Sequence, residues 1–356
     1  MRETVAPPAI APPRVAVRPR ASAAPSATSP RATYETFYGF NDKPFAADSD
    51  LRFLYHSSAH DRVLHDLSSS VENGDAIAVL TAPDGMGKTM LCRALVDQLD
   101  RRTLVSFVAH PPASAENLLS TLLVDFGVVS GDEADAGRLT SASRVDLSGA
   151  LRDFLRSLAG LEATALVILD DAHRLPDAVL HELRSLADVG ASGKLLQIVL
   201  VGDDSLTRQL TSSEFRAIDD RVAARLELGP LDGDEVPGYV AHRLALAGRG
   251  ERVGFSEVGL RKVYALSRGV PGVINQICDG ALTLGYQSSA SNIDGDLVDA
   301  AAQQLGLLPT AAGASWRERV IIIVLMLALM LAGAAGAGWV FREPLGRVLA
   351  QFSHAR

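Results

Sequence analysis

The sequence contains little that would build a disulfide framework, a clustered metal centre or a nucleic-acid surface. Only two of its 356 residues are cysteine, Cys92 and Cys278, and they lie far apart in segments with helical patterns. This spacing excludes a disulfide framework and suits a reducing compartment. Lysine and arginine number 34 against 42 aspartate and glutamate, which gives a formal net charge of -8. That acidic balance argues against broad electrostatic binding to nucleic acid, which needs cations to neutralise phosphates.

The N-terminal stretch lacks the apolar run of an export signal. Residues 1–33 are rich in proline, alanine, serine and arginine, and Glu3 is the single acid among them. We interpret residues 1–36 as a disordered arm. Because no export signal precedes it, we expect the large part of the chain that follows to stay in the cytoplasm.

A long uncharged run stands near the other end of the chain. Val320–Phe341 reads VIIIVLMLALMLAGAAGAGWVF, 22 residues without a charge, which is long enough for a helix to cross the hydrocarbon core of a bilayer. Trp316 and Trp339 stand where interfacial aromatic side chains belong. We therefore predict one transmembrane helix at 320–341, preceded by a linker at 307–319 and followed by a short tail at 342–356. A buried core helix is the alternative.

Between these ends, a short apolar run is followed by a glycine-rich loop and a helical pattern. The run DAIAVLTA (Asp75–Ala82) is typical of a strand, and KTMLCRALVDQL has apolar residues at helical spacing. The loop fits the pattern G-x-x-x-x-G-K-[ST], except that Ala82 stands where the first glycine belongs. In this context, backbone N–H groups and a helix N-terminus bind phosphate, whereas the alternative is an ordinary tight turn. The predicted nucleotide-binding residues are Asp84, Gly85, Met86, Gly87, Lys88, Thr89 and Met90.

A second strand pattern ends in two acids. ALVILDDAH (Ala165–His173) is a continuous aliphatic run, as expected of a buried parallel strand, and Asp170 and Asp171 follow it. Parallel sheets bind ligands at the carboxyl ends of their strands. We therefore predict that Asp170 supports a Mg²⁺ ion at this edge, where P-loop proteins place such a carboxylate. The alternative is a pair of solvated loop acids.

The order of the remaining patterns predicts an α/β fold followed by a helical subdomain. Further strand candidates are Thr103–His110, Leu195–Gly202 and Arg225–Leu231, with helical patterns between them. Alternating strands and helices indicate a mostly parallel sheet covered on both faces. The polar segment Val129–Ser143 is predicted to be a flexible insertion. From Asp232 onward the patterns are helical, and no further strand is expected.

Four further segments stand in a characteristic order: FYGFNDKPFAADSDLRFLYHSSAH before the loop, then LLQIVLVG, LELGPL and GVPGVINQICDGAL. Together with the loop, they resemble the ExeA-type (general secretion pathway protein A) AAA+ ATPases. The resemblance covers roughly Phe37–Gln287. It implies a P-loop AAA+ core at 37–231, a C-terminal helical lid at 232–306, and ATP with Mg²⁺ as cofactors.

The resemblance also implies location and partners. The family is anchored in the bacterial inner membrane, with a single span and the ATPase domain in the cytoplasm. Self-association into a dimer or ring is expected. The implied partner is a protein of an envelope export system, serving secretion, pilus assembly or exopolysaccharide export. Nucleic acid is an unlikely partner because of the acidic balance of the chain.

By position, the resemblance assigns roles to the best-matched residues. Lys88 would contact the β- and γ-phosphates of ATP, Thr89 would ligate Mg²⁺, and Asp170 would hold the water shell of the metal. Arg221 and Arg225 match arginines that reach the γ-phosphate of a neighbouring subunit; a solvated helix face is the alternative for both.

Three departures from the family pattern lie near the γ-phosphate. Asp171 stands where hydrolysing relatives carry glutamate to position the attacking water. Asp203 occupies the first sensor position, which is usually glutamine, and Gly272 replaces an arginine of the lid. Because positioning dominates phosphoryl transfer, a carboxylate shorter by one methylene slows the reaction. We expect an ATPase that binds ATP and hydrolyses it slowly. The alternatives are an ATP-occupancy switch and a DNA-associated ATPase, and the acidic charge and the predicted span oppose the second.

Overall fold

The computed structural model describes residues 33–308, except 48–49, 136–138, 140–141, 192–193 and 249–252. The chain divides into two compact units, residues 1–298 and residues 299–356. Of the second unit, only residues 299–308 are described, and they include the end of a helix. The predicted N-terminal arm up to residue 32 and the predicted span Val320–Phe341 lie outside the described residues. Within the described part, none of the helices combines the length and apolar character needed to cross a membrane.

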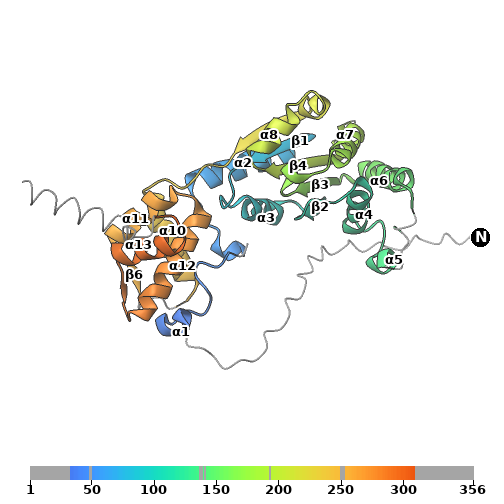
Figure 1. The fold of residues 1–356 in the computed structure, drawn as a ribbon. Coiled ribbons are helices and arrows are strands. Elements are labelled where there is room, and N and C mark those ends of the chain that lie inside the picture. The colour runs from blue at the N-terminus through green and yellow to red at the C-terminus, as the bar shows by residue number, and fades with distance from the viewer. Residues whose placement is uncertain are drawn as a thin grey trace, which may run out of the picture. The chain divides into compact units, whose positions relative to one another are not determined.

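A five-stranded parallel sheet forms the centre of the first part of the chain (Figure 1). Its strands lie in the order β2-β3-β4-β1-β5, so that β1 lies between β4 and β5. The strand order therefore reverses beside β1, and open α/β sheets bind ligands at the carboxyl ends of their strands at such a point. The strands are β1 (Ile77–Thr81), β2 (Thr103–Val108), β3 (Thr164–Leu169), β4 (Leu196–Gly202) and β5 (Val222–Glu227).

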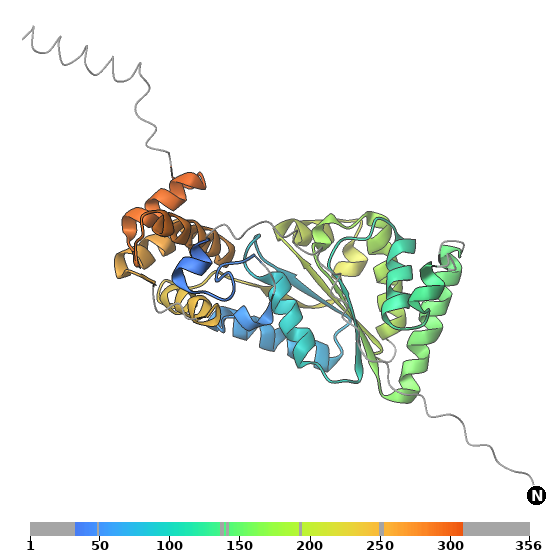
Figure 2. The ribbon, with the colours of Figure 1, turned by 90° about the horizontal axis from the view of Figure 1, so that it is seen from below.

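Helices cover both faces of this sheet, as predicted. They are α2 (Ser58–Asn73), α3 (Lys88–Gln98), α4 (Ala115–Asp125), α5 (Gly131–Asp135), α6 (Arg144–Leu158), α7 (Asp177–Ala191), α8 (Asp204–Leu210) and α9 (Arg216–Asp219). The same part of the chain contains short 3₁₀ turns, η1 (Leu51–Phe53), η2 (Ala159–Leu161) and η3 (Ala172–Arg174). In Figure 2, the blue and blue-green helices α2 and α3 lie on one side of the strands, and the green helices lie on the other.

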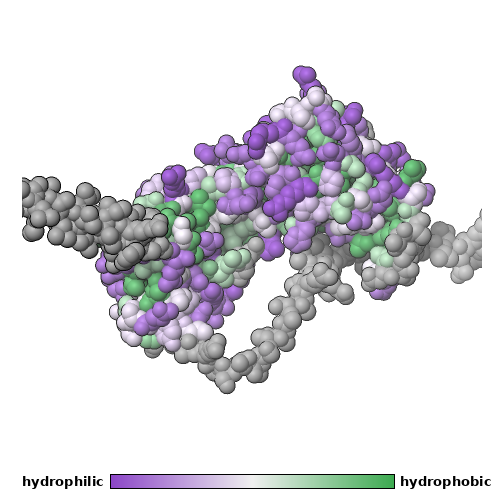
Figure 3. Space-filling model, in the orientation of Figure 1, coloured by the Kyte–Doolittle hydropathy of each residue, from purple (hydrophilic) through white to green (hydrophobic). Residues whose placement is uncertain are grey.

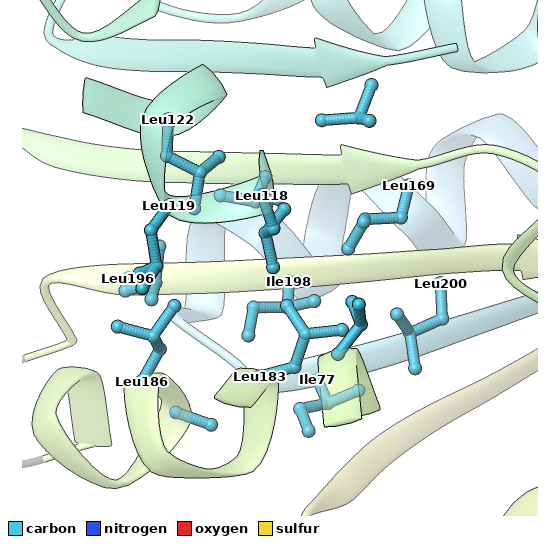
Figure 4. Packing of buried hydrophobic residues seen from close by; sticks show 14 of the residues in the cluster. Ile77, Leu118, Leu119, Leu122, Leu169, Leu183, Leu186, Leu196, Ile198 and Leu200 are labelled. Carbon is cyan, nitrogen blue, oxygen red and sulfur yellow. The ribbon is translucent and has the colours of Figure 1, made fainter. Parts of the chain in front are cut away.

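Successive strand residues alternate between two apolar layers. Ile77, Ile198 and Leu200 pack among leucines of α4, α6 and α7, and Figure 4 shows this layer from close by. Ala78 and Val199, their neighbours in sequence, pack instead against α2 and α3. Because side chains alternate along a strand, a continuous aliphatic run supplies both layers at once. On the face drawn in Figure 3, the surface of the described residues is mainly hydrophilic.

A helical subdomain follows the sheet and contains α10 (Glu235–Leu246), α11 (Glu257–Ser267), α12 (Pro271–Gln287) and α13 (Gly295–Gln304). We call the part of it that belongs to the first unit, residues 232–298, the lid. The helix α1 (Tyr34–Tyr38) precedes the sheet in sequence but packs against α12. The phenol of Tyr34 donates a 2.5 Å hydrogen bond to Asp279.

The prediction that no strand follows Asp232 is wrong. Two short strands, β6 (Gly254–Phe255) and β7 (Asn292–Ile293), pair in parallel within the lid. The N–H groups of Gly254 and Ser256 donate to the carbonyls of Ser291 and Ile293 at 3.3 and 2.9 Å. Two loops that run side by side thus satisfy each other's backbone groups, and segments of two residues carry no periodicity that a sequence could reveal.

Two other predicted boundaries also differ from the structure. β5 begins at Val222, three residues before the predicted Arg225. β5 is an edge strand in which half-buried and exposed residues alternate, so its start lacks the aliphatic run that marks a central strand. The polar segment predicted to be a flexible insertion contains the short helix α5.

Candidate functional site

The predicted phosphate loop joins β1 to α3 at the carboxyl edge of the sheet. Gly85 and Gly87 have φ of 81° and 94°, a left-handed conformation that side chains disfavour. The helix α3 begins at Lys88, and its N-cap Gly87 supplies no side-chain hydrogen bond. By contrast, serine side chains cap α2, α4 and α6. The first N–H groups of a helix have no intrahelical acceptor, so those of α3 are available to an anion.

The side chain of Lys88 is buried and bonded to the inside of the loop. Its Nζ donates to the carbonyl oxygens of Ala82 at 2.7 Å and Pro83 at 3.1 Å, and lies 3.4 Å from Asp84 Oδ1. These oxygens stabilise an ammonium group that would otherwise be costly to bury. Ala82 itself is fully buried, and its N–H donates to Gly202 of β4 at 3.1 Å. The methyl group at this departure from the motif is therefore accommodated.

Thr89 and Asp170 lie side by side, although they come from different elements. The hydroxyl of Thr89, in the first turn of α3, donates to Asp170 Oδ2 at 2.5 Å. The other oxygen of Asp170 accepts the N–H of Asp171 at 3.0 Å. A hydroxyl beside a carboxylate suits Mg²⁺, which prefers oxygen ligands and is usually held by one or two protein groups plus substrate phosphates. No group of three or more His, Cys, Asp or Glu arranged to hold a metal occurs among the described residues.

Asp171 lies directly after Asp170 but faces a different partner. Its φ of 52° is in the left-handed region, which aspartate tolerates better than most residues with a Cβ. Its Oδ2 lies 3.8 Å from the guanidinium of Arg174 in η3. The candidate water-positioning carboxylate is therefore paired within its own loop.

Asp203 caps a helix at the end of the neighbouring strand. Its Oδ1 accepts both the N–H of Ser205, at 2.9 Å, and the Ser205 hydroxyl. The side-chain hydrogen bond from Ser205 lowers the pKa of Asp203, with smaller contributions from His173 and Lys88, while burial acts in the opposite direction. Asp203 is thus a charged N-cap of α8 that also lies within electrostatic range of Lys88.

The two predicted arginine fingers lie outside the nucleotide cavity. Arg221 forms an ion pair with Asp188 of α7, and Arg225 of β5 forms one with Asp219 of α9. Neither arginine lines the cavity next to the phosphate loop. Arg225 lies on the exposed face of an edge strand, so a solvated helix face does not describe its position.

Residues 84–90, Asp170 and Asp171 line one cavity of about 640 Å³, within the usual size range of small-ligand pockets, whereas Asp203 does not line it. Residues 84–90 and the acids Asp170 and Asp171 form one wall. The segment that precedes α2, together with α10 and α12 of the lid, forms the other. This second wall also includes His60, Tyr239 and Asn275, for which the sequence suggested no role.

A buried arginine joins the lid to the segment before the loop. Arg243 of α10 is only 2% exposed, and its guanidinium lies 4.7 Å from the centre of the Phe53 ring. It donates to the carbonyl oxygens of Pro44 at 2.7 Å and Ala46 at 3.0 Å. Pro44, Ala46 and Phe53 lie in a segment that entered the sequence analysis only through its family resemblance, and nothing in its spacing reveals the contact with Arg243.

Comparisons with known proteins agree with this fold. Residues 71–210 match the family model of an AAA domain. The general secretion pathway protein A of Aeromonas hydrophila is 29% identical over 310 residues, which cover 86% of this chain. The match covers 54% of that relative, so the chain spans about half of its length.

Solved structures show the same fold at low sequence identity. The Aeropyrum pernix ORC2 protein, in its ADPNP and ADP complexes, is 16% identical with a TM-score of 0.56, over 83% of this chain and 80% of that one. The Cdc6p of Pyrobaculum aerophilum is 16% identical with a TM-score of 0.55, over 73% of this chain and 70% of that one.

Fold, loop and matches together define the class: a nucleotide-binding protein of the P-loop AAA type. The matches also confirm the resemblance predicted from the sequence. Over most of its length the chain is similar to the general secretion pathway protein A, of the ExeA-type group of AAA+ proteins.

Proposed function

We propose that this chain binds ATP with Mg²⁺, hydrolyses it slowly, and thereby assists or regulates a bacterial envelope export system from the inner membrane. The observation that carries the proposal is the single cavity in which an uncapped helix N-terminus, the buried Lys88 and the adjacent oxygens of Thr89 and Asp170 converge. Each of these features favours a polyphosphate with a divalent cation.

Different groups of the loop would bind different parts of MgATP. The N–H groups of residues 85–89 would bind the phosphate oxygens, and the ammonium of Lys88 would exchange the loop carbonyls for phosphate oxygens. Thr89 and Asp170 would hold Mg²⁺, which when bound neutralises charge on the phosphates. The fit rests on the hydroxyl–carboxylate pair and on the absence of a competing side-chain cap at α3.

Slow hydrolysis is part of the proposal because the residues expected to complete the reaction are engaged elsewhere. Asp171 is paired with Arg174, and Asp203 caps α8. The same engagement favours a second candidate, a switch in which ATP occupancy rather than turnover changes partner binding. Self-association would decide between them, since Arg221 and Arg225 can reach a nucleotide only in another subunit.

The export role rests on the name of the relative, General secretion pathway protein A, of which this chain covers about half. Anchoring through Val320–Phe341, with the ATPase part in the cytoplasm, belongs to the same proposal. A DNA-associated role is disfavoured by the net charge of -8.

The proposal is tested by nucleotide-dependent thermal stabilisation of the purified full chain. At a ligand concentration of about 100 times Kd, binding stabilises the folded state by roughly 2.7 kcal/mol. Lys88→Ala should abolish this stabilisation, and Asp170→Asn should remove its dependence on Mg²⁺. Lys194→Ala serves as a control, because Lys194 contacts the carbonyl of Asn73 and does not line the cavity. Equal melting of wild type and Lys88→Ala, with and without MgATP, would show that the cavity is not a nucleotide site.

A further inference from the structure

Two carbonyl groups of the phosphate loop accept hydrogen bonds from outside the loop. The carbonyl of Gly85 accepts the N–H of Gly272, in the first turn of α12, at 2.8 Å. The carbonyl of Met86 lies 3.0 Å from Nε2 of His60, in α2. The loop is thus held by the lid and by the helix that precedes β1.

These bonds fix the directions of the neighbouring N–H groups. In a trans peptide, the C=O of one residue and the N–H of the next point in opposite directions. With the carbonyls of Gly85 and Met86 directed at Gly272 and His60, the N–H groups of Met86 and Gly87 face away from those donors. A row of N–H groups that share one side of a loop forms an anion-binding concavity.

Building on the proposed nucleotide function, we infer that Gly272 and His60 are positioning residues. They orient the peptide planes of the phosphate loop, so that the affinity of the loop for nucleotide depends on how the lid packs against it. They act through the loop and need not touch the nucleotide. The family resemblance implies an arginine at position 272, and here the backbone N–H of Gly272 contacts the loop instead.

The contact at Gly272 leaves no room for a side chain. A Cβ built on Gly272 would lie 2.9 Å from the Cα of Gly85 and 3.2 Å from its carbonyl oxygen. Both are backbone atoms, which cannot turn aside as a flexible side chain could. Any other residue at 272 must therefore push α12 away from the loop.

His60 is held in one orientation from both ring nitrogens. A carbonyl oxygen can only accept, so Nε2 carries the proton shared with Met86, and Nδ1 accepts from the Ser57 hydroxyl at 2.7 Å. The next residue of that turn, Ser58, donates from its N–H and its hydroxyl to Glu235 of α10, at 2.9 and 3.1 Å. The lid therefore contacts the Gly85 carbonyl directly through Gly272. It is linked to the Met86 carbonyl indirectly, through Glu235, the first turn of α2 and His60.

The first test measures affinity for ADP and for ATP, each with Mg²⁺, by calorimetry on the purified full chain. Gly272→Ala should weaken both by about tenfold, because overpacking against backbone displaces the lid. Gly259→Ala is the matched control: its Cβ would meet the carbonyl of Ile293, also at 2.9 Å, but within the lid. It should lower the melting temperature and leave nucleotide affinity within about twofold of wild type.

The second test uses Gly272→Arg, which introduces the arginine that the family resemblance implies at this position. The close contact predicts a loss of affinity at least as large as that of Gly272→Ala. Tighter binding or faster hydrolysis in Gly272→Arg, or tighter binding in Gly272→Ala, would overturn the inference, because the lid would then not rest on the loop in the working state.

The third test separates orientation from mere stability at His60. His60→Ala should weaken nucleotide binding about threefold to tenfold, the worth of one hydrogen bond. His60→Gln should recover most of the loss, since an amide N–H can still donate to Met86. Unchanged affinity in Gly272→Ala and His60→Ala, beside loss in Lys88→Ala, would refute this inference and leave the proposed function standing. Absence of binding in wild type would instead refute the proposed function.

Discussion

The charged groups expected to bind the nucleotide and those expected to act on its γ-phosphate differ in how they are engaged. On the phosphate-loop side, Lys88 is bonded to oxygens of the loop itself, and Thr89 is bonded to Asp170. These partners belong to the loop itself or to the adjacent Asp170, so ligand oxygens can replace them without moving any helix. The binding half of the site is therefore assembled within one chain.

The groups expected to act on the γ-phosphate are instead paired with residues outside the cavity. Asp171 faces Arg174, Arg221 faces Asp188, and Arg225 faces Asp219. Exposed ion pairs of this kind are worth at most about 1 kcal/mol each, so they can be exchanged, but only when a competing partner arrives. The difference predicts binding that is independent of assembly and hydrolysis that depends on it.

The largest predicted effect concerns Arg221 and Arg225, the two arginines assigned as fingers. We expect ATP hydrolysis per subunit to rise with protein concentration, and Arg221→Ala or Arg225→Ala to remove that rise, because an arginine supplied by a neighbour accelerates phosphoryl transfer by about 10³-fold or more. Phosphate release over a series of protein concentrations measures this. The affinity for ATP should not change, since neither arginine lines the cavity.

The partner of one arginine provides a matched control. Asp188→Asn removes the ion pair of Arg221 and should raise hydrolysis modestly, by no more than about fivefold, because the pair is exposed. If both arginine variants keep the rate and the concentration dependence of wild type, the fingers have been assigned to the wrong residues.

A smaller effect is expected from lengthening the carboxylate at position 171. Asp171→Glu should raise kcat by about tenfold, because its oxygens reach further toward the γ-phosphate. It should also cost roughly 1 kcal/mol of stability, since the φ of 52° disfavours side chains longer than those of aspartate and asparagine. Asp171→Asn, which suits the same backbone, should lower kcat with stability unchanged. A wild-type rate that falls in Asp171→Glu would show a site adapted to the shorter acid.

The sheet and the binding half of the site could be predicted because both depend on neighbouring residues. The aliphatic runs at β1, β3 and β4 directly indicate buried strands. The spacing of Gly85, Gly87, Lys88 and Thr89 matches a phosphate-binding loop. Asp170 follows from the same logic, since it ends one of these runs.

The rest of the site could not be predicted because it depends on contacts between distant segments. In the sequence, Gly272 is only a position at which an expected arginine is missing. In the structure, its N–H donates to the carbonyl of Gly85. Arg243 looks like one more charge on a helix, yet it is buried against Pro44 and Phe53. Periodicity reveals which face of a helix is buried, but it does not reveal which segment covers that face.

The smallest effect concerns the pH dependence of stability at the junction of the two halves. Burial lowers the pKa of His60 below its ordinary value of about 6.5, although the Met86 carbonyl and the carboxylates of Glu235 and Asp61 act in the opposite direction. The unfolded chain therefore takes up a proton at this residue more readily than the folded chain does. It follows that the stability His60 contributes is fully present above pH 6.5 and is lost as the pH falls through that value toward the lower folded pKa. Urea unfolding of wild type and His60→Gln from pH 5.5 to 8 measures the difference, because glutamine keeps a donor for Met86 but does not titrate. The advantage of wild type over His60→Gln should shrink on acidification. If it grows instead, the histidine is held as a cation by Glu235 and Asp61, and burial is not the dominant influence on its ring.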